Sequence, residues 1–202
     1  MMAEREFVQQ IGEIYRLKVP FESLYTSVFL IKADGVNVLV DCATYDSDVD
    51  GYIVPALAKM GLVLTDIEYL VLTHSHGDHA GGRERILQLN PNVKIAENEQ
   101  VKLPNGLTMY ALKGHTLDCI GVFDERTNTL ISGDGLQGAG IGKYRCSLQS
   151  KEEYIKTIVK IQQNKSIKNV LFSHAYEPWY KDCALGREEA EQCLQDCLQY
   201  VK

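Results

Sequence analysis

The chain has 202 residues, of which 45% are apolar and 24% charged, as is ordinary for a soluble globular protein with one core of good size. The net charge of −6 is spread along the chain, with no basic stripe for phosphates, so we expect no nucleic-acid partner. No basic N-terminal segment precedes an apolar stretch, and no run of about 18 apolar residues occurs. The sequence therefore predicts neither export nor a membrane partner, and favours a cytoplasmic protein.

The first part of the chain predicts antiparallel strands followed by a helix. We expect strands over residues 11–19, 27–32 and 36–40, with Asp34-Gly35 as the hairpin turn between the last two. A helix is expected within residues 47–60, with Gly61 as its stop. Pro55 would break or kink this helix unless the helix proper starts near it. A strand over 67–72 and a helix over about 81–89 complete this part.

The second part repeats the same pattern of strands and helices. Strands are expected over residues 93–96, 107–112, 120–124, 129–132 and 169–172, and helices over 151–163 and from 186 onward. The sequence contains no long linker, low-complexity tract or repeat that would mark a domain boundary. We therefore expect one domain over residues 1–202.

Three of the five histidines fall within six residues, directly after the strand expected at 67–72. In an extended segment, alternate side chains leave the same face, so His74, His76 and Asp78 are expected to converge. A turn at Gly77 would redirect His79 toward them. Three imidazoles and a carboxylate are ligands that zinc and iron take, so the string predicts a metal site.

Three further polar residues, His115, Asp134 and His174, also follow apolar runs. If these runs are buried strands, their ends can share one rim of a sheet, where open α/β folds usually bind ligands. A lone histidine at such a place is more often a core or surface residue. Here the histidine-rich string favours the interpretation that His115 and His174 join the metal site.

The motifs, taken in order, are similar to those of a known family. The string His74-x-His76-x-Asp78-His79 precedes Gly114-His115-Thr116, Gly133-Asp134 and Ser173-His174. In order and approximate spacing, over about residues 20–180, this chain resembles the metallo-β-lactamase superfamily of hydrolases. The resemblance implies an α/β fold, the four-layer αβ/βα sandwich, in which two mixed β-sheets are flanked by helices.

The resemblance also implies a ligand assignment for two divalent metal ions. One ion would be held by His74, His76 and His115, and the second by Asp78, His79 and His174, with Asp134 bridging both. Zinc is the first candidate for both ions, and iron and manganese are alternatives.

One motif departs from the family pattern. The family usually reads Gly-His-Thr-Pro-Gly followed by Ser, Cys or His, whereas this chain has Leu117-Asp118-Cys119 after Thr116. The turn after His115 must therefore be built differently. Asp118 would either add negative charge near the site or serve as a plain turn residue.

Several other residues leave two interpretations open. Asp41, at the end of the strand 36–40, either steadies a ligand histidine or ends the strand. The glycine-rich segment 133–143 lacks the P-loop pattern and is interpreted as a backbone that lets substrate approach closely. Three aromatic residues either line a pocket or pack, namely Tyr144, Tyr176 and Trp179. The six cysteines include no Cys-x-x-Cys pair and are expected to be reduced.

The leading functional hypothesis is a metal-dependent hydrolase that uses a metal-bridged hydroxide on a small-molecule ester, thioester or lactone. Asp78 is the candidate proton carrier, as proposed for relatives. Superfamily β-lactamases lack an aspartate at the position of Asp134, so antibiotic hydrolysis is not expected. The alternatives are a mononuclear-iron oxidoreductase of the persulfide dioxygenase type, using His74, His115 and Asp134, and a non-catalytic metal-binding module. Substrate identity and oligomeric state are not predicted.

Overall fold

The computed structural model describes residues 5–104, 106–137, 148–176, 181–199 and 201. Tyr144, Trp179 and most of the glycine-rich segment lie outside these described residues. The chain folds into two compact units. The first unit comprises Met1–Glu97 and Leu103–Asn105, and the second comprises Asn98–Lys102 and Gly106–Lys202. The prediction of one domain over residues 1–202 remains a prediction.

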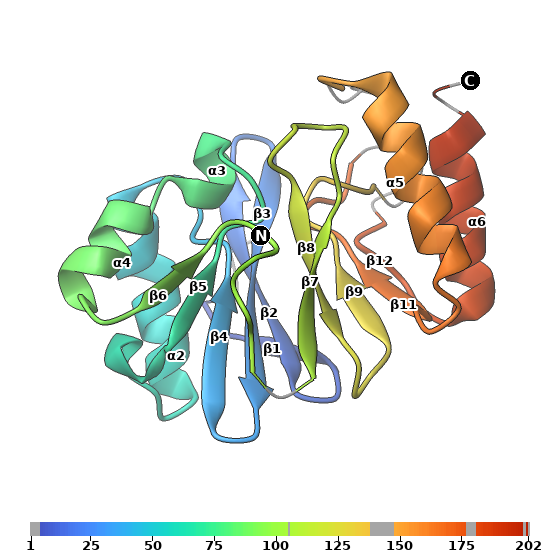
Figure 1. Cartoon of the computed structure of the whole chain (residues 1–202). Helices are drawn as coiled ribbons and strands as arrows, with labels where there is room; N and C mark the ends of the chain where they lie inside the picture. Colours follow the sequence, from blue (N-terminus) through green and yellow to red (C-terminus); the bar gives the residue numbers. More distant parts are fainter. Residues whose placement is uncertain (1–4, 105, 138–147, 177–180, 200, 202) are drawn as a thin grey trace. The chain divides into compact units, whose positions relative to one another are not determined.

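The first unit is built on a six-stranded mixed sheet whose strands lie in chain order (Figure 1). The strands are β1 Val8–Ile11, β2 Ile14–Phe21, β3 Leu24–Ala33, β4 Val36–Val40, β5 Tyr69–Val71 and β6 Lys94–Ala96. Strands β1 to β4 pair antiparallel, whereas β5 pairs parallel with both β4 and β6. The predicted Asp34-Gly35 turn joins β3 to β4, and both residues have the positive φ that a tight hairpin requires (49° and 89°).

Short helices pack on one face of this sheet. They are α1 Asp46–Asp48, a π-helix Val49–Ile53, α2 Val54–Lys59, a 3₁₀ turn Leu64–Asp66, α3 Gly77–Ala80 and α4 Arg83–Leu89. Pro55 is the second residue of α2, which continues directly from the π-helix Val49–Ile53, so the proline lies inside a longer helical run instead of at its start. Gly61 follows the helix with φ 72°. Sheet residues such as Leu30 and Leu39 form one buried cluster with helix residues such as Leu57.

The second unit contains a five-stranded mixed sheet and two longer helices (Figure 1). Its strands are β7 Leu107–Ala111, β8 Ile120–Asp124, β9 Thr129–Ile131, β11 Asn169–Leu171 and β12 Cys183–Ala184, in the order β12-β11-β9-β8-β7. Its helices are α5 Lys151–Gln163 and α6 Arg187–Gln199. Both helices pack on the sheet, and Tyr154, Ile158 and Cys197 are buried against sheet residues such as Phe123 and Val170.

The directions of the strands in the second unit place the C-terminal ends of three strands at one edge of the sheet. Strand β8 runs antiparallel to β7 and to β9, and β9 runs parallel to β11. Strands β7, β9 and β11 therefore point the same way, and their C-terminal ends lie at the same edge. These are the strands that His115, Asp134 and His174 follow.

The structure confirms the predicted fold class, with two mixed sheets flanked by helices. The rim expected for the runs before His115, Asp134 and His174 is found at the ends of β7, β9 and β11. Strand β5, which the histidine-rich string follows, belongs to the first unit's sheet, so the four strand ends do not share one sheet. Alternating apolar runs reveal strands but carry no information about which sheet each strand joins. Among the described residues, no helix is long and apolar enough to cross a membrane.

Candidate metal centre

The histidine-rich string lies directly after β5 in the first unit. Strand β5 ends at Val71, and the chain stays irregular until α3 begins at Gly77. The expectation that Asp78 continues an extended segment was wrong, because Asp78 and His79 lie within α3. Gly77 starts the helix, so the last two predicted ligands are presented by a helical turn instead of by alternation along a strand.

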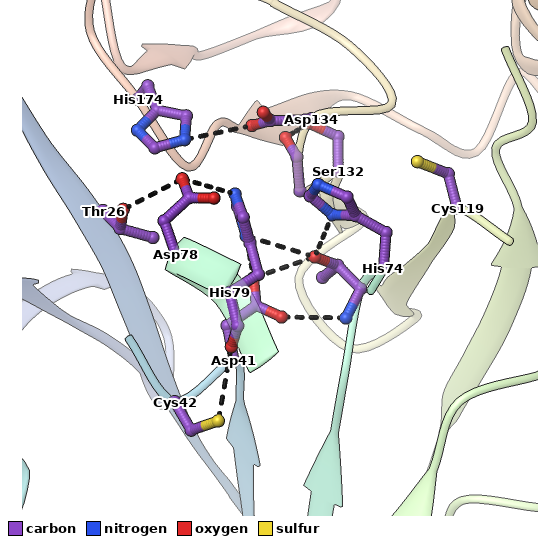
Figure 2. Close-up of polar contacts among 12 residues, drawn as sticks. Thr26, Asp41, Cys42, His74, Asp78, His79, Cys119, Ser132, Asp134 and His174 are labelled. Atoms are coloured by element: carbon purple, nitrogen blue, oxygen red, sulfur yellow. Dashed lines mark hydrogen bonds and ion pairs between the residues drawn. The ribbon is translucent and has the colours of Figure 1, made fainter. Parts of the chain in front are cut away.

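Asp41 accepts three hydrogen bonds from the strand end and the helix that carry these histidines. Its carboxylate takes the backbone N–H of Thr73 at 2.8 Å and the Thr73 hydroxyl at 2.9 Å. It also contacts Nδ1 of His79 at 2.8 Å, as Figure 2 shows. Asp41, Thr73 and His79 are fully buried. Asp41 therefore steadies a predicted ligand histidine, which decides between the two interpretations of this residue.

The same contacts indicate which ring nitrogens carry protons. The Thr73 hydroxyl donates its single proton to Asp41, so the contact of its oxygen with His74 Nδ1 at 3.2 Å requires an Nδ1–H donor. A carboxylate accepts only, so His79 likewise donates from Nδ1. In both neutral rings the lone pair then resides on Nε2, the atom left to ligate a metal.

The side chains of the predicted ligands in the first unit lie close together. The ring centroid of His74 lies 4.6 Å from that of His76 and 4.1 Å from that of His79. Asp78 Oδ2 lies 3.3 Å from Nε2 of His79 and accepts a hydrogen bond from the Thr26 hydroxyl at 3.4 Å. Strand β3 thus contributes a contact that orients Asp78.

Close backbone packing anchors α3 against the segment after β4. The N–H of Cys42 donates to the carbonyl of His79 at 2.8 Å, and the Cys42 thiol contacts the same oxygen at 3.3 Å. A Cβ on Gly81 would lie 2.0 Å from the carbonyl oxygen of Thr44, so this approach requires glycine. Burial, the largest cause, raises the pKa of the Cys42 thiol far above its ordinary value, so this thiol stays neutral.

The second unit brings its three predicted ligands together at the edge where β7, β9 and β11 end. His115 Nε2 lies 3.7 Å from Asp134 Oδ2. His174 Nε2 lies 3.4 Å from Asp134 Oδ1, as Figure 2 shows. The two carboxylate oxygens of Asp134 therefore face different imidazoles. All three side chains are buried. The Ser132 hydroxyl donates to the Leu171 carbonyl at 3.3 Å, which ties the end of β9 to that of β11.

The chemistry of the donors fits a divalent cation. The candidates offer only imidazole nitrogens and carboxylate oxygens, the donors that zinc and iron take. The residues that could hold an ion are His74, His76, Asp78 and His79 in the first unit, and His115, Asp134 and His174 in the second. Burying several imidazoles and carboxylates within a few ångströms is costly unless a shared positive charge or hydrogen bonds compensate. A bound cation would supply that charge.

Two residues near the predicted ligands, Asp118 and Tyr176, had two interpretations each. Asp118 is exposed in the turn after His115, and the ring centroid of Tyr176 lies 5.4 Å from that of His174. Burial raises the pKa of Cys119 to about 11, and its thiol contacts the Thr116 hydroxyl at 2.9 Å. Away from the predicted ligands, Cys193 is buried in the core of the second unit, and its thiol donates to the Gln137 carbonyl at 3.3 Å.

Two residues that contact the predicted ligands, Thr73 and Thr26, were not predicted from the sequence. Thr73 immediately precedes the histidine-rich string, so its position was a signal that the hydroxyl would face the same network. Thr26 is 52 residues away from Asp78 in the chain. No local pattern in the sequence marks it, because its role depends on the position of β3 in the folded unit.

Comparison with known proteins identifies relatives of this chain. Residues 23–110 match the model of the metallo-beta-lactamase superfamily. The chain is 27% identical over 164 residues to a beta-lactamase-like protein 2 homolog from Caenorhabditis elegans, covering 71% of this chain and 54% of that protein. It is 27% identical over 146 residues to an atrochrysone carboxyl ACP thioesterase from Pseudocercospora fijiensis, covering 62% and 43%.

A third relative is a hydroxyacylglutathione hydrolase from Francisella tularensis subsp. novicida. It is 28% identical over 111 residues, covering 47% of this chain and 44% of that protein. This chain therefore spans about half the length of the curated relatives it matches.

Solved structures share the fold. A metallo-beta-lactamase from Erythrobacter litoralis aligns with a TM-score of 0.72 at 16% identity, over 96% of both chains. Rubredoxin oxygen:oxidoreductase from Desulfovibrio gigas aligns with a TM-score of 0.70 at 15% identity, over 97% of this chain and 61% of that one. At these identities the alignments show the fold alone, and the same fold occurs in a β-lactamase and in an oxidoreductase.

Proposed function

Because this chain belongs to the metallo-β-lactamase superfamily, we propose that it is a metal-dependent hydrolase with a binuclear centre, acting on a small molecule that contains an activated acyl bond. We propose zinc as the metal. The proposed first ion is held by His74, His76 and His115, and the second by Asp78, His79 and His174, with Asp134 shared.

The observation that carries this proposal is the orientation of the imidazoles. In the first unit, Asp41 and Thr73 accept hydrogen bonds from Nδ1–H of His79 and His74, so the lone pair of each ring lies on Nε2, the atom that would bind a metal. In the second unit, Nε2 of His115 and His174 faces opposite oxygens of Asp134. A carboxylate with one oxygen toward each of two ligands suits a bridging role between two ions.

Bound divalent ions would supply two kinds of chemistry, lowering the pKa of water toward about 7 and polarising an acyl carbonyl. The protein's own residues orient the ligands and move protons. Asp78 is partly exposed, and the Thr26 hydroxyl contacts its Oδ2. We propose that Asp78 shuttles a proton at this oxygen during turnover, because a carboxylate reachable by solvent can exchange the proton that hydrolysis releases.

A thioester is the substrate class that we propose to test first. Two of the relatives described above are named for the hydrolysis of acyl compounds, one as a thioesterase and the other as a hydroxyacylglutathione hydrolase. The chemistry of a thioester suits a metal-assisted route, because the thiolate is a good leaving group and needs little help from a protein acid. Esters and lactones are the next classes to test.

The test combines metal analysis with turnover. Purified protein is loaded with zinc, its metal content is measured by mass spectrometry, and acyl-glutathione, acyl-pantetheine, ester and lactone substrates are assayed. We expect about two zinc ions per chain and hydrolysis of at least one acyl class. Asp134→Asn should lower both metal content and turnover, whereas Asp66→Asn, at an exposed carboxylate that accepts from the Val63 N–H at 2.8 Å, should change neither. A protein that holds two zinc ions yet hydrolyses none of these acyl bonds would contradict the proposal.

The alternative is the mononuclear-iron oxidoreductase. The fold does not decide between the two activities, since rubredoxin oxygen:oxidoreductase has the same fold. Iron-loaded protein is therefore tested for oxygen uptake with glutathione persulfide. One iron per chain, persulfide-dependent oxygen uptake and no acyl hydrolysis would replace the hydrolase by this alternative, and metal binding with neither activity would favour a non-catalytic module.

A further inference from the structure

The turn that carries His115 is fastened to the start of helix α5. We call residues 113–118 the His115 turn. Its Gly114 carbonyl accepts from the N–H of Ser150 at 3.0 Å, and the His115 carbonyl accepts from the N–H of Gln149 at 3.1 Å. Ser150 is the N-cap of α5 and its hydroxyl accepts from the Glu153 N–H, so the residues that hold the turn are themselves fixed by the helix.

The first half of the His115 turn is also held by packing. Gly114 has φ 146°, and a Cβ there would lie 2.5 Å from the Cβ of Tyr154, so glycine and the buried tyrosine are in direct contact. The Thr157 hydroxyl donates to the Lys113 carbonyl at 2.7 Å. This half of the turn therefore has little freedom.

The second half of the turn is more open to solvent. Leu117 is 48% exposed and Asp118 is also exposed. The side chain of Gln149 reaches this half, because the N–H of Leu117 donates to its Oε1 at 2.9 Å. Gln149 thus holds the turn at two points, through its own N–H at His115 and through its side chain at Leu117.

This contact restrains the backbone at Leu117, the position that proline occupies in the family motif. Proline at position 117 would fix φ and would carry no N–H. Leucine at this position has a freely rotating φ angle and a backbone N–H donor. The amide oxygen of Gln149 takes up that donor and restrains the backbone at the place where proline would have restrained it.

We propose that Gln149 is a positioning residue for His115, holding its backbone through the Leu117 N–H so that the imidazole keeps its place beside Asp134. Its role is to fix the turn that presents the ligand, and it acts on the metal site only through His115. The inference rests on the proposed function, since it assigns Gln149 a role in the affinity of the metal site.

The test is a double-mutant cycle on metal affinity and on backbone exchange. Zinc affinity is measured by competition with a chromophoric chelator in the wild type, Gln149→Ala, Leu117→Pro and the double variant. Amide hydrogen exchange at Leu117 is followed by NMR in the metal-free proteins. Gln149→Glu keeps an acceptor oxygen, and Gln163→Ala removes an exposed glutamine at the far end of α5 as the matched control.

We expect Gln149→Ala to weaken zinc binding about tenfold, the lower end of the range for residues that orient ligands, and to speed exchange of the Leu117 amide. Gln149→Glu and Gln163→Ala should behave like the wild type. In the Leu117→Pro background, Gln149→Ala should have little further effect, because the donor that it served is gone.

Equal zinc affinity in Gln149→Ala and the wild type would overturn the inference while leaving the hydrolase proposal intact. An equal effect of Gln149→Ala in both backgrounds would also overturn it, since the contribution would then not pass through the Leu117 N–H. If the wild type binds no divalent metal, the proposed function fails, and unchanged Leu117 exchange in Gln149→Ala would show independently that Gln149 does not hold the turn.

Discussion

Replacing Asp41 by asparagine should reverse the protonation pattern of two ligand histidines without disturbing the backbone. Asp41 has φ 63°, a left-handed conformation that asparagine also adopts readily, so the substitution adds little strain. Its Oδ1 accepts from the Thr73 N–H, which an asparagine carbonyl can still do. Its Oδ2 accepts from the Thr73 hydroxyl and from His79 Nδ1, and there the new NH₂ group would present a donor.

Two donors cannot share one hydrogen bond, so the network must rearrange. His79 would move its proton to Nε2 and accept from the amide at Nδ1. The Thr73 hydroxyl would accept from the same amide and turn its proton toward Nδ1 of His74, which lies 3.2 Å away. Both rings would then carry a proton on Nε2, the atom proposed to ligate the metal.

The expected magnitude follows from the role of Asp41 in orienting a ligand. Loss of such a partner typically costs about 10–100-fold in metal affinity, which corresponds to about 1.4–2.8 kcal/mol. The assay is zinc competition with a chelator, accompanied by nitrogen-15 NMR of the imidazoles to assign their tautomers. Asp66→Asn, which alters an exposed carboxylate that accepts from a backbone N–H, is the control. Wild-type Nε2–H tautomers at His74 and His79, or unchanged zinc affinity in Asp41→Asn, would refute this reasoning.

Three other outcomes are expected. Gly114→Ala should lower the free energy of unfolding by about 2–4 kcal/mol in urea titrations, because its Cβ would collide with Tyr154. The control Gly186→Ala, at φ 86° with open space around it, should cost only about 1 kcal/mol. Equal losses in the two variants would contradict the clash. His76→Ala should lower zinc content, and full stoichiometry would remove His76 from the ligand set. Burial raises the pKa of Cys119 to about 11, so the folded state keeps the thiol proton to a higher pH than the unfolded chain does. The resulting stabilisation is complete below the ordinary thiol pKa and is lost as pH rises to about 11. Between pH 8 and 11 the wild type should therefore lose about 1–2 kcal/mol more stability than Cys119→Ala, and parallel pH profiles would count against this.

The residue types of the candidate ligands and their places after strands could be predicted from the sequence because both are local properties. The chain order of histidines and aspartates is read directly, and apolar runs such as 36–40, 120–124 and the helical pattern of 151–163 match β4, β8 and α5. The short strands β1 and β12 were not predicted. At four and two residues they are too brief for a periodic signal to distinguish them from loops.

Tertiary structure decided what depends on register and direction. The antiparallel pairing of β7, β8 and β9, with β11 parallel to β9, is what places His115, Asp134 and His174 at one edge. The partners that orient the predicted ligands come from far along the chain, as Asp41 does for His79 at a separation of 38 residues. Gln149, 32 residues from Leu117, is likewise found only in the folded unit. A sequence pattern reports which chemistry a residue offers, whereas hydrogen bonds over such separations exist only once strand pairing and helix packing have fixed the distance between their partners.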